Sequence, residues 1–200
     1  PDCLLFSEEG IKNSEQVEHL NKGKWLVVDP LDGSLNFFHG VPLYGYMATY
    51  LLDGKISASV IVLPKDGQYI VFENGKFTFS KHLSFNNSAV GSTVYYGYAP
   101  NQRADQRLTR NILFDLIDKK TAGFYRYGSA CAGLYNLICQ NHKIFIGHGI
   151  RVWDALAYMP VLKELGHTVK YAIIDNELTM VTGFDQNLID EIVRVIKDNQ

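Results

Sequence analysis

The chain has 200 residues, of which 46% are hydrophobic and 20% charged, with 17 Gly, 6 Pro and a formal net charge of −2. This composition predicts a soluble globular protein of one large domain or two small ones, and it excludes the disordered, collagen-like and disulfide-scaffold classes. A net charge near zero supplies no broad basic field for nucleic acid or an anionic membrane. No apolar run approaches the roughly 20 residues of a membrane span.

The three cysteines are Cys3, Cys131 and Cys139, an odd count without CxxC spacing. Cys131 and Cys139 fall eight residues apart on one predicted helix, too far along it for a disulfide. We therefore expect free thiols in a reducing, cytoplasmic environment.

The first half of the chain is predicted to be mostly β-sheet. Apolar runs bounded by turn residues predict strands at residues 3–6, 25–28, 43–52, 56–63, 69–72 and 90–98, with a loop at 11–24. Asp53-Gly54 and Asn74-Gly75 are hairpin turn signals, so residues 43–80 are expected to form an antiparallel sheet. Residues 25–28 are apolar without alternation, which predicts a strand buried on both faces.

The second half alternates helices and strands. Helical spacing and capping residues predict helices at 103–119, 129–140, 154–165 and 186–197, and short apolar runs predict strands at 124–127, 143–146 and 168–174. A seam near residues 98–103 separates a sheet-rich half, 1–98, from an alternating α/β half, 99–200. We expect the two halves to share contacts as one domain.

The stretch from Trp25 to Ser34 is the most informative in the sequence. Its strand delivers Asp29 and Asp32 at its carboxyl end, with Pro30 between them, and Gly33 and Ser34 follow. Carboxylates at this spacing suit Mg²⁺, which prefers oxygen ligands, and backbone N–H groups at a helix start suit a phosphate oxygen. The same residue types also form ordinary turns, so the short motif alone leaves both readings open.

The longer string resembles a family signature. Asp-Pro-Leu-Asp-Gly-Ser at 29–34, followed by Asn36-Phe37, Gly40 and Pro42, resembles the signature of the inositol monophosphatase superfamily of Mg²⁺-dependent phosphatases. Two further motifs of that family occur in order, the Glu pair at Glu8-Glu9 and Trp-Asp at Trp153-Asp154. The resemblance covers residues 1 to about 170.

The resemblance implies a metal site built from five positions. Glu8 and Asp29, with the carbonyl of Leu31, would bind a first Mg²⁺. Asp29, Asp32 and Asp154 would bind a second, and Glu8 would hold a third, weaker ion through water. Four converging carboxylates would otherwise repel one another, which is a physical reason for cations at this point. Direct in-line attack by a metal-activated water is the implied reaction.

The implied substrate is a small phosphorylated alcohol, most readily inositol monophosphate, hydrolysed as a phosphoric monoester. The catalytic residues would be Glu8, Asp29, Asp32, Ser34 and Asp154. The substrate would contact Asp32, Gly33, Ser34, Gly128, Ser129, Ala130 and Asp154. Lithium sensitivity, a homodimer and a cytoplasmic location are typical of the family, and neither nucleic acid nor a membrane is an expected partner.

The sequence departs from the pattern on the alcohol side of the site. Where inositol phosphatases carry an acid that binds ring hydroxyls, seven residues before Asp154, this chain has Gly147. The family arginine three residues before Gly128 is Tyr125, and Arg126 lies one place later. A nucleotide or sugar phosphatase, including a fructose-1,6-bisphosphatase, is therefore an alternative on the same scaffold. A non-catalytic binding or regulatory member of the fold is the alternative from another class.

The implied fold is α/β (α+β), a layered α/β/α/β/α sandwich of the sugar-phosphatase type. In the family, helices precede the Glu-Glu strand, which here begins at the start of the sequence. We therefore expect the N-terminal helical layer to be missing and apolar surface to be exposed. His148 and Arg151, just before Trp153, are further candidates for the mouth of the site.

Overall fold

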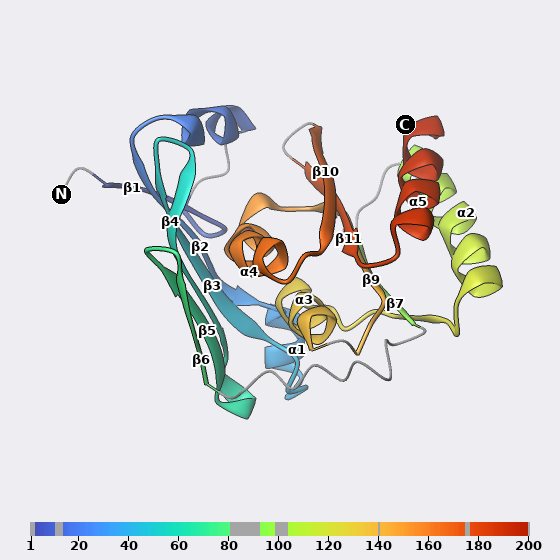
Figure 1. The fold of residues 1–200 in the computed structure, drawn as a ribbon, viewed down its shortest axis with the longest axis horizontal. Coiled ribbons are helices and arrows are strands. Elements are labelled where there is room, and N and C mark those ends of the chain that lie inside the picture. The colour runs from blue at the N-terminus through green and yellow to red at the C-terminus, as the bar shows by residue number, and fades with distance from the viewer. Residues whose placement is uncertain are drawn as a thin grey trace.

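Two β-sheets and the helices between and beside them make up the fold (Figure 1). The structure is a computed structural model, and it describes residues 3–10, 14–80, 93–98, 104–139, 141–174 and 177–199. The predicted strand at 90–98 thus begins partly outside the described residues. Among the helices within these ranges, none combines the length and the apolar character needed to cross a bilayer.

The first sheet has six strands in chain order. They are β1 (Cys3–Ser7), β2 (Lys24–Asp32), β3 (Gly45–Leu52), β4 (Lys55–Leu63), β5 (Gln68–Glu73) and β6 (Lys76–Phe79). β1 is parallel to β2 and the other pairs are antiparallel. Asp53-Gly54 and Asn74-Gly75 turn with positive φ at both residues, as two-residue hairpin loops require, which confirms the predicted meander.

The second sheet has five strands in the order β10-β11-β9-β7-β8. They are β7 (Val94–Tyr98), β8 (Phe124–Tyr125), β9 (Ile144–Ile150), β10 (Thr168–Ile174) and β11 (Glu177–Gly183). β7 is parallel to β8 and β9, whereas β11 is antiparallel to both β9 and β10. The carboxyl ends of β7, β8 and β9 therefore lie at the same edge of this sheet.

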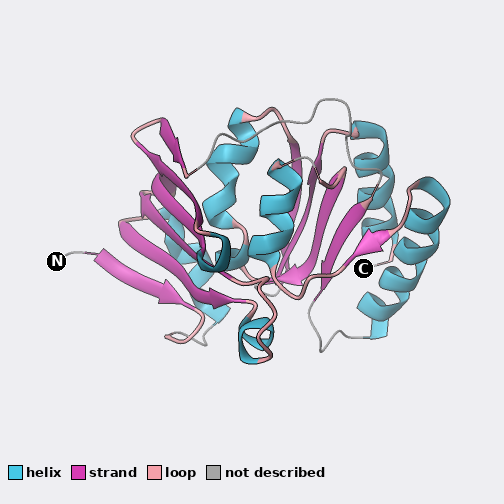
Figure 2. Cartoon of the chain, turned by 90° about the horizontal axis from the view of Figure 1, so that it is seen from below, coloured by secondary structure: helices cyan, strands magenta, loops and turns pink. Residues whose placement is uncertain are grey.

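The helices form two layers. α3 (Ala130–Ile138) and α4 (Met159–Glu164) lie between the sheets, and α2 (Ala104–Lys120) and α5 (Gln186–Asp198) cover the far side of the second sheet (Figures 1 and 2). The shorter elements are the helix α1 (Ser34–Phe38) and the 3₁₀ turns η1 (Ser14–Asn21), η2 (Pro64–Asp66), η3 (Val152–Asp154) and η4 (Leu156–Tyr158). The order sheet, helices, sheet, helices gives four of the five layers that the resemblance implies.

The largest core fills the space between the sheets. Met47 and Ile61 from the first sheet, Phe145 and Met180 from the second, and Leu134 of α3 belong to one buried cluster. Each such side chain contributes about 1.5–3 kcal/mol when fully buried. This central core fixes the position of the α3 N-terminus between the two sheets.

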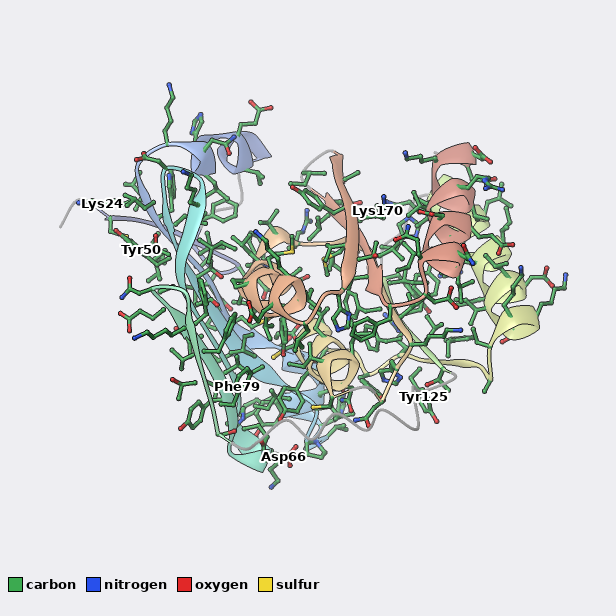
Figure 3. The ribbon with its side chains drawn as sticks, in the orientation of Figure 1. Lys24, Tyr50, Asp66, Phe79, Tyr125 and Lys170 are labelled. Atoms are coloured by element: carbon green, nitrogen blue, oxygen red, sulfur yellow. The ribbon has the colours of Figure 1, made fainter. Side chains whose placement is uncertain are left out.

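The outer face of the first sheet carries apolar side chains. Leu5, Leu26 and Tyr50 are neighbours on this face through the pairings of β1, β2 and β3. Leu5 is 52% exposed and Leu26 is 37% exposed, and Tyr50 lies on the side away from the helices (Figure 3). β2 is therefore buried on one face and partly open on the other, unlike the predicted strand buried on both faces.

The structure differs from the sequence prediction at several places along the chain. Residues 14–21 form a 3₁₀ helix within the expected loop, and β11 was not predicted although its apolar residues alternate. The change of sheet falls before β7, because Val94–Tyr98 pairs with β8 and β9 and not with the first sheet. β7 thus groups with the second half, ahead of the predicted seam at 98–103.

The helix predicted at 154–165 is broken into η3, η4 and α4. Ala155 separates the two 3₁₀ turns with φ −133°, outside the helical region. Pro160 lacks an N–H group and lies in the first turn of α4, where proline is tolerated. Asp154 consequently ends a 3₁₀ turn and does not open an α-helix, which corrects the predicted start of a helix at residue 154.

Candidate metal centre

β2 positions two of the predicted metal ligands at its carboxyl end. Asp29 is 1% exposed and Asp32 is 8% exposed. The pairing of β2 with β3 shifts register between these two residues, where Pro30 has no N–H group to donate to the ladder. The Leu31 N–H donates to Asp29 Oδ1 at 3.0 Å, so Leu31 orients this carboxylate through its amide.

Asp154 reaches the same point from the second sheet. It follows the end of β9 by four residues, and its Oδ2 accepts the backbone N–H of Arg151 at 2.8 Å. The neighbouring Trp153 packs against Phe6 of β1, with ring centroids 5.3 Å apart. This contact ties the Trp-Asp segment to the strand that precedes the Glu pair.

The three aspartates meet at one place. One carboxylate oxygen from each of Asp29, Asp32 and Asp154 lies within 4.8 Å of the other two. Burial, together with the charges of Asp32 and Glu8, raises the pKa of Asp29 to about 8. Burial and the charge of Asp32 also raise the pKa of Asp154 well above its ordinary value.

Such a group fits a hard divalent cation. Negative charges this close repel one another unless they hold protons or share a positive ion. The three donors are all carboxylate oxygens, which Mg²⁺ prefers over nitrogen and sulfur ligands. The aspartates from β2 and η3 therefore provide a suitable donor set for Mg²⁺.

Glu8 lies at the rim of this group, in the turn after β1. Burial raises the pKa of Glu8, and the charges of Glu9 and Asp32 raise it further, whereas a hydrogen bond with Asp29 lowers it. The interaction with Asp29 places Glu8 next to the three aspartates. Glu9 is exposed.

Asp32 is held by the N-terminus of α3. The Ser129 hydroxyl donates to Asp32 Oδ2, the Cys131 N–H donates to the same oxygen at 2.8 Å, and the Ala130 N–H donates to Oδ1 at 3.1 Å. Burial raises the pKa of Asp32, while these three hydrogen bonds lower it. Ser129 also accepts the Ala132 N–H at 3.0 Å and so caps α3.

The sequence prediction assigned Ser129 and Ala130 to the substrate pocket, and their contact with Asp32 was missed. The sequence indicated the helix cap, because a serine precedes an apolar helix. It did not indicate the contact with Asp32, because that contact joins residues 97 to 99 positions apart. Binding of substrate by these two residues stays a prediction.

Asn36 joins α1 to the segment before α3, a role that the sequence did not reveal. Its Nδ2 donates to the carbonyls of Leu43 and Tyr127, both at 2.6 Å. Gly128, in the left-handed region at φ 71°, would place a Cβ 3.4 Å from Asn36 Oδ1. Asn36 thus fixes α1 beside the loop that leads into Ser129.

Gly33 turns the chain from β2 into α1. Its φ of 82° lies in the left-handed region, and a Cβ here would lie 2.9 Å from the Leu43 carbonyl oxygen and 3.0 Å from Ser129 Cβ. Glycine is therefore required on both conformational and steric grounds. Ser34, the first residue of α1, is exposed.

The two additional candidates lie differently from the prediction. His148 is buried, and its Nδ1 is 3.1 Å from the Tyr96 hydroxyl on the α2 side of the second sheet, so it does not reach the mouth of the site. Arg151 is exposed and contributes its backbone N–H to Asp154.

Comparison with known proteins agrees with the motifs. A profile of the inositol monophosphatase family matches residues 1–188. The chain belongs to this family. It is 28% identical to a histidinol-phosphatase of Chlorobaculum parvum, over 94% of the chain and 75% of that protein. It is 26% identical to a fructose-1,6-bisphosphatase/inositol-1-monophosphatase of Thermotoga maritima, over 99% of the chain and 75% of that protein.

The same fold occurs in solved structures. The extragenic suppressor protein suhB from Bartonella henselae superposes with a TM-score of 0.78 at 22% identity, covering 100% of this chain and 78% of that one. The α+β architecture of two sheets and two helical layers is therefore the architecture of the inositol monophosphatase fold.

Proposed function

We propose that this protein is a Mg²⁺-dependent phosphomonoesterase that hydrolyses a small phosphorylated alcohol. The observation that carries the proposal is the convergence of Asp29, Asp32 and Asp154, which one bound cation could contact together. The named relatives, a histidinol-phosphatase and a fructose-1,6-bisphosphatase/inositol-1-monophosphatase, support phosphate-ester hydrolysis on this scaffold.

The three aspartates would hold the metal, with Glu8 beside Asp29. Bound divalent cations supply charge neutralisation for the phosphate and lower the pKa of a water molecule. The protein's own contribution is positioning. Ser129 and the first N–H groups of α3 orient Asp32, and the Arg151 N–H orients Asp154. Gly33 and Ser34 start α1, whose first N–H groups have no carbonyl partner within the helix and suit a phosphate oxygen.

The test is phosphate release from a panel of phosphomonoesters with Mg²⁺ and with a chelator. The panel contains inositol 1-phosphate, histidinol phosphate, fructose 1,6-bisphosphate and 4-nitrophenyl phosphate. Asp32→Asn removes one charge from the site, and Asp118→Asn on the exposed side of α2 is the matched control. We expect Mg²⁺-dependent release that Asp32→Asn abolishes and Asp118→Asn leaves intact.

Two results would reject the proposal. Undiminished hydrolysis by the Asp32→Asn variant would exclude the aspartate group as the catalytic centre. Binding of Mg²⁺ by the wild type, without hydrolysis of any ester in the panel, would favour a non-catalytic binding member of the fold.

A further inference from the structure

The first turn of α3, which holds Asp32, is itself anchored by two buried tyrosines. The Tyr158 hydroxyl donates to the Cys131 carbonyl at 2.8 Å. The Tyr95 hydroxyl donates to the Ser129 carbonyl at 2.8 Å. Cys131 and Ser129 are two of the residues whose N–H and hydroxyl groups donate to Asp32. One tyrosine hydroxyl therefore holds the main chain of each of these two residues.

Tyr158 also connects the two segments that carry the buried carboxylates. It is the last residue of η4, four positions after Asp154. Its own N–H donates to the Ala155 carbonyl at 3.0 Å, which closes a short turn next to Asp154. Its hydroxyl lies 3.5 Å from Cys131 Sγ in addition to bonding the Cys131 carbonyl. Tyr158 thus links the segment of Asp154 to the turn of α3 that holds Asp32.

Tyr95 attaches the same turn of α3 to the second sheet. Its ring stacks on Phe145 of β9, with centroids 4.9 Å apart and an interplanar angle of 7°. A Cβ on Gly133 of α3 would lie 2.7 Å from this ring, so the helix backbone approaches Tyr95 at a distance that only glycine permits. This packing fixes the position from which the Tyr95 hydroxyl reaches the Ser129 carbonyl.

Both hydroxyls stay protonated and act as donors. Burial raises the pKa of Tyr158 and of Tyr95, and the charge of Asp32 raises both further. A buried tyrosine hydroxyl usually finds a hydrogen-bond partner. The particular feature of these two is that their partners are carbonyls of the turn that orients Asp32.

We propose that Tyr158 and Tyr95 are positioning residues that together fix the spacing of the Asp32 and Asp154 carboxylates for a small divalent cation. The proposal rests on the proposed metal-dependent function and adds the residues that select the cation. Mg²⁺ requires nearly ideal octahedral geometry at about 2.0–2.1 Å, whereas Ca²⁺ accepts flexible geometry at about 2.3–2.6 Å. Loosening the two carboxylates should therefore weaken Mg²⁺ binding more than Ca²⁺ binding.

The test is calorimetric titration of the metal-free protein with Mg²⁺ and, separately, with Ca²⁺. Tyr158→Phe keeps the ring and removes the hydroxyl. It should lower the Mg²⁺ affinity by about 10-fold, the lower end of the effect of residues that orient a metal ligand. The ratio of Mg²⁺ to Ca²⁺ affinity should fall by about 3- to 10-fold, because Ca²⁺ tolerates the looser spacing. Tyr95→Phe should lower the same ratio.

Tyr96→Phe is the matched control, since it removes a buried tyrosine hydroxyl from the same strand. Tyr96 belongs to the buried cluster that faces α2 and α5, and its hydroxyl lies 3.1 Å from His148 Nδ1. This variant should leave the ratio of affinities as in the wild type, whatever its effect on the melting temperature. A purely structural role of Tyr158 and Tyr95 would likewise lower the melting temperature and leave the ratio unchanged.

The possible failures are distinct. A wild-type protein that binds neither cation would reject the candidate metal centre and with it the proposed function. Wild-type binding of Mg²⁺, with a ratio that Tyr158→Phe and Tyr95→Phe leave unchanged, would reject the role of the tyrosines while metal binding stands. If Tyr158→Phe does not fold, the ratio in Tyr95→Phe alone decides between these results.

Discussion

At the scale of one residue, the buried carboxylate of Asp29 lowers the stability of the metal-free fold. Its carboxylate is buried beside Asp32 and near Glu8, and this environment raises its pKa to about 8. A carboxylate among like charges opposes folding, and a bound cation would relieve the repulsion. Removing the charge should therefore stabilise the metal-free protein and weaken metal binding.

Asp29→Asn is expected to raise the melting temperature of the metal-free protein at pH 8 by roughly 2–4 °C, the shift that about 1 kcal/mol produces in a chain of this length. Outer-shell changes cost about 10–100-fold in metal affinity, and loss of a direct ligand should cost at least as much. Thermal unfolding with and without Mg²⁺ measures both effects. Asp118→Asn is the control, and a lower melting temperature for Asp29→Asn without metal would contradict the expectation.

Ser129 has two roles through one hydroxyl group, since it donates to Asp32 and accepts the Ala132 N–H. Ser129→Ala should destabilise the fold by about 1–3 kcal/mol through the lost cap and the lost bond to the carboxylate. It should also weaken Mg²⁺ binding by about 10–100-fold, because Asp32 loses an orienting donor. Urea unfolding and calorimetric Mg²⁺ titration measure the two effects.

Ser129→Thr retains the hydroxyl and should preserve both properties. Equal Mg²⁺ affinity in the alanine variant and the wild type would show that Ser129 caps α3 without positioning Asp32.

The sequence revealed more about the individual candidate ligands than about the residues that hold them in place. The spacing of Asp29, Asp32 and Gly33 predicted carboxylates at a strand end, and the structure places them there. The contacts of Asp32 with α3 and of Asn36 with the Tyr127 carbonyl join distant segments. No local pattern reports such contacts, because they depend on how the two sheets are packed.

At the scale of elements, the turn from β2 into α1 depends on a single glycine. Alanine at a left-handed position costs about 1–2 kcal/mol. At Gly33 the added Cβ would also meet the Leu43 carbonyl oxygen, whereas at Gly23, with φ 80°, it would meet nothing within 4 Å. The two glycines therefore separate the conformational cost from the steric one.

Gly23→Ala should reduce the free energy of unfolding by about 1–2 kcal/mol, and Gly33→Ala by about 2–5 kcal/mol, because overpacking adds about 1–3 kcal/mol. Gly33→Ala should in addition reduce the proposed phosphatase activity, since the turn carries the N–H groups that we propose to bind phosphate. Urea unfolding of both variants gives the comparison. Equal losses of unfolding free energy in the two variants would show that the structure accommodates the added Cβ next to Leu43 without a steric penalty.

Elements with a strong hydrophobic periodicity were predicted well. Elements that depend on a single residue with unusual backbone geometry were not. The amphipathic pattern predicted α2 and α5 closely, and the turn dipeptides predicted the meander. The segment at 154–165 was predicted as one helix because its composition is helical. Pro160 and the non-helical φ of Ala155 break it. A proline two turns inside a predicted helix was the available signal for this break.

At the scale of the whole molecule, the layers follow from which faces are apolar. The second sheet is covered on both sides, by α3 and α4 on one and by α2 and α5 on the other, and the buried strand β9 reflects this. The order of its strands, with β9 between β11 and β7, was not predictable, because parallel neighbours come from segments far apart in the sequence. The candidate metal centre lies where the end of β2 and the turn η3 after β9 meet the start of α3.

Stability should therefore depend on pH and Mg²⁺ together. The pKa values of Asp29, Asp32 and Asp154 are raised in the folded state, so without metal their contribution is fully present below their ordinary pKa of about 4. It is lost as pH rises through the folded values, about 8 for Asp29. His142 and His167 act oppositely, because burial lowers each pKa to about 4, and their contribution is lost as pH falls below 6.5.

Mg²⁺ competes with protons for the aspartates and not for the two histidines. Added Mg²⁺ therefore separates the pH dependence due to the aspartates from that due to the histidines. The rise in melting temperature on adding Mg²⁺ should be small at pH 5.5 and should grow toward pH 8, where fewer protons must be displaced. Melting curves at fixed Mg²⁺ across this range measure the trend, and Asp29→Asn should flatten it. An Mg²⁺-induced rise of the same size at pH 5.5 and pH 8 would mean that the cation binds away from the buried aspartates.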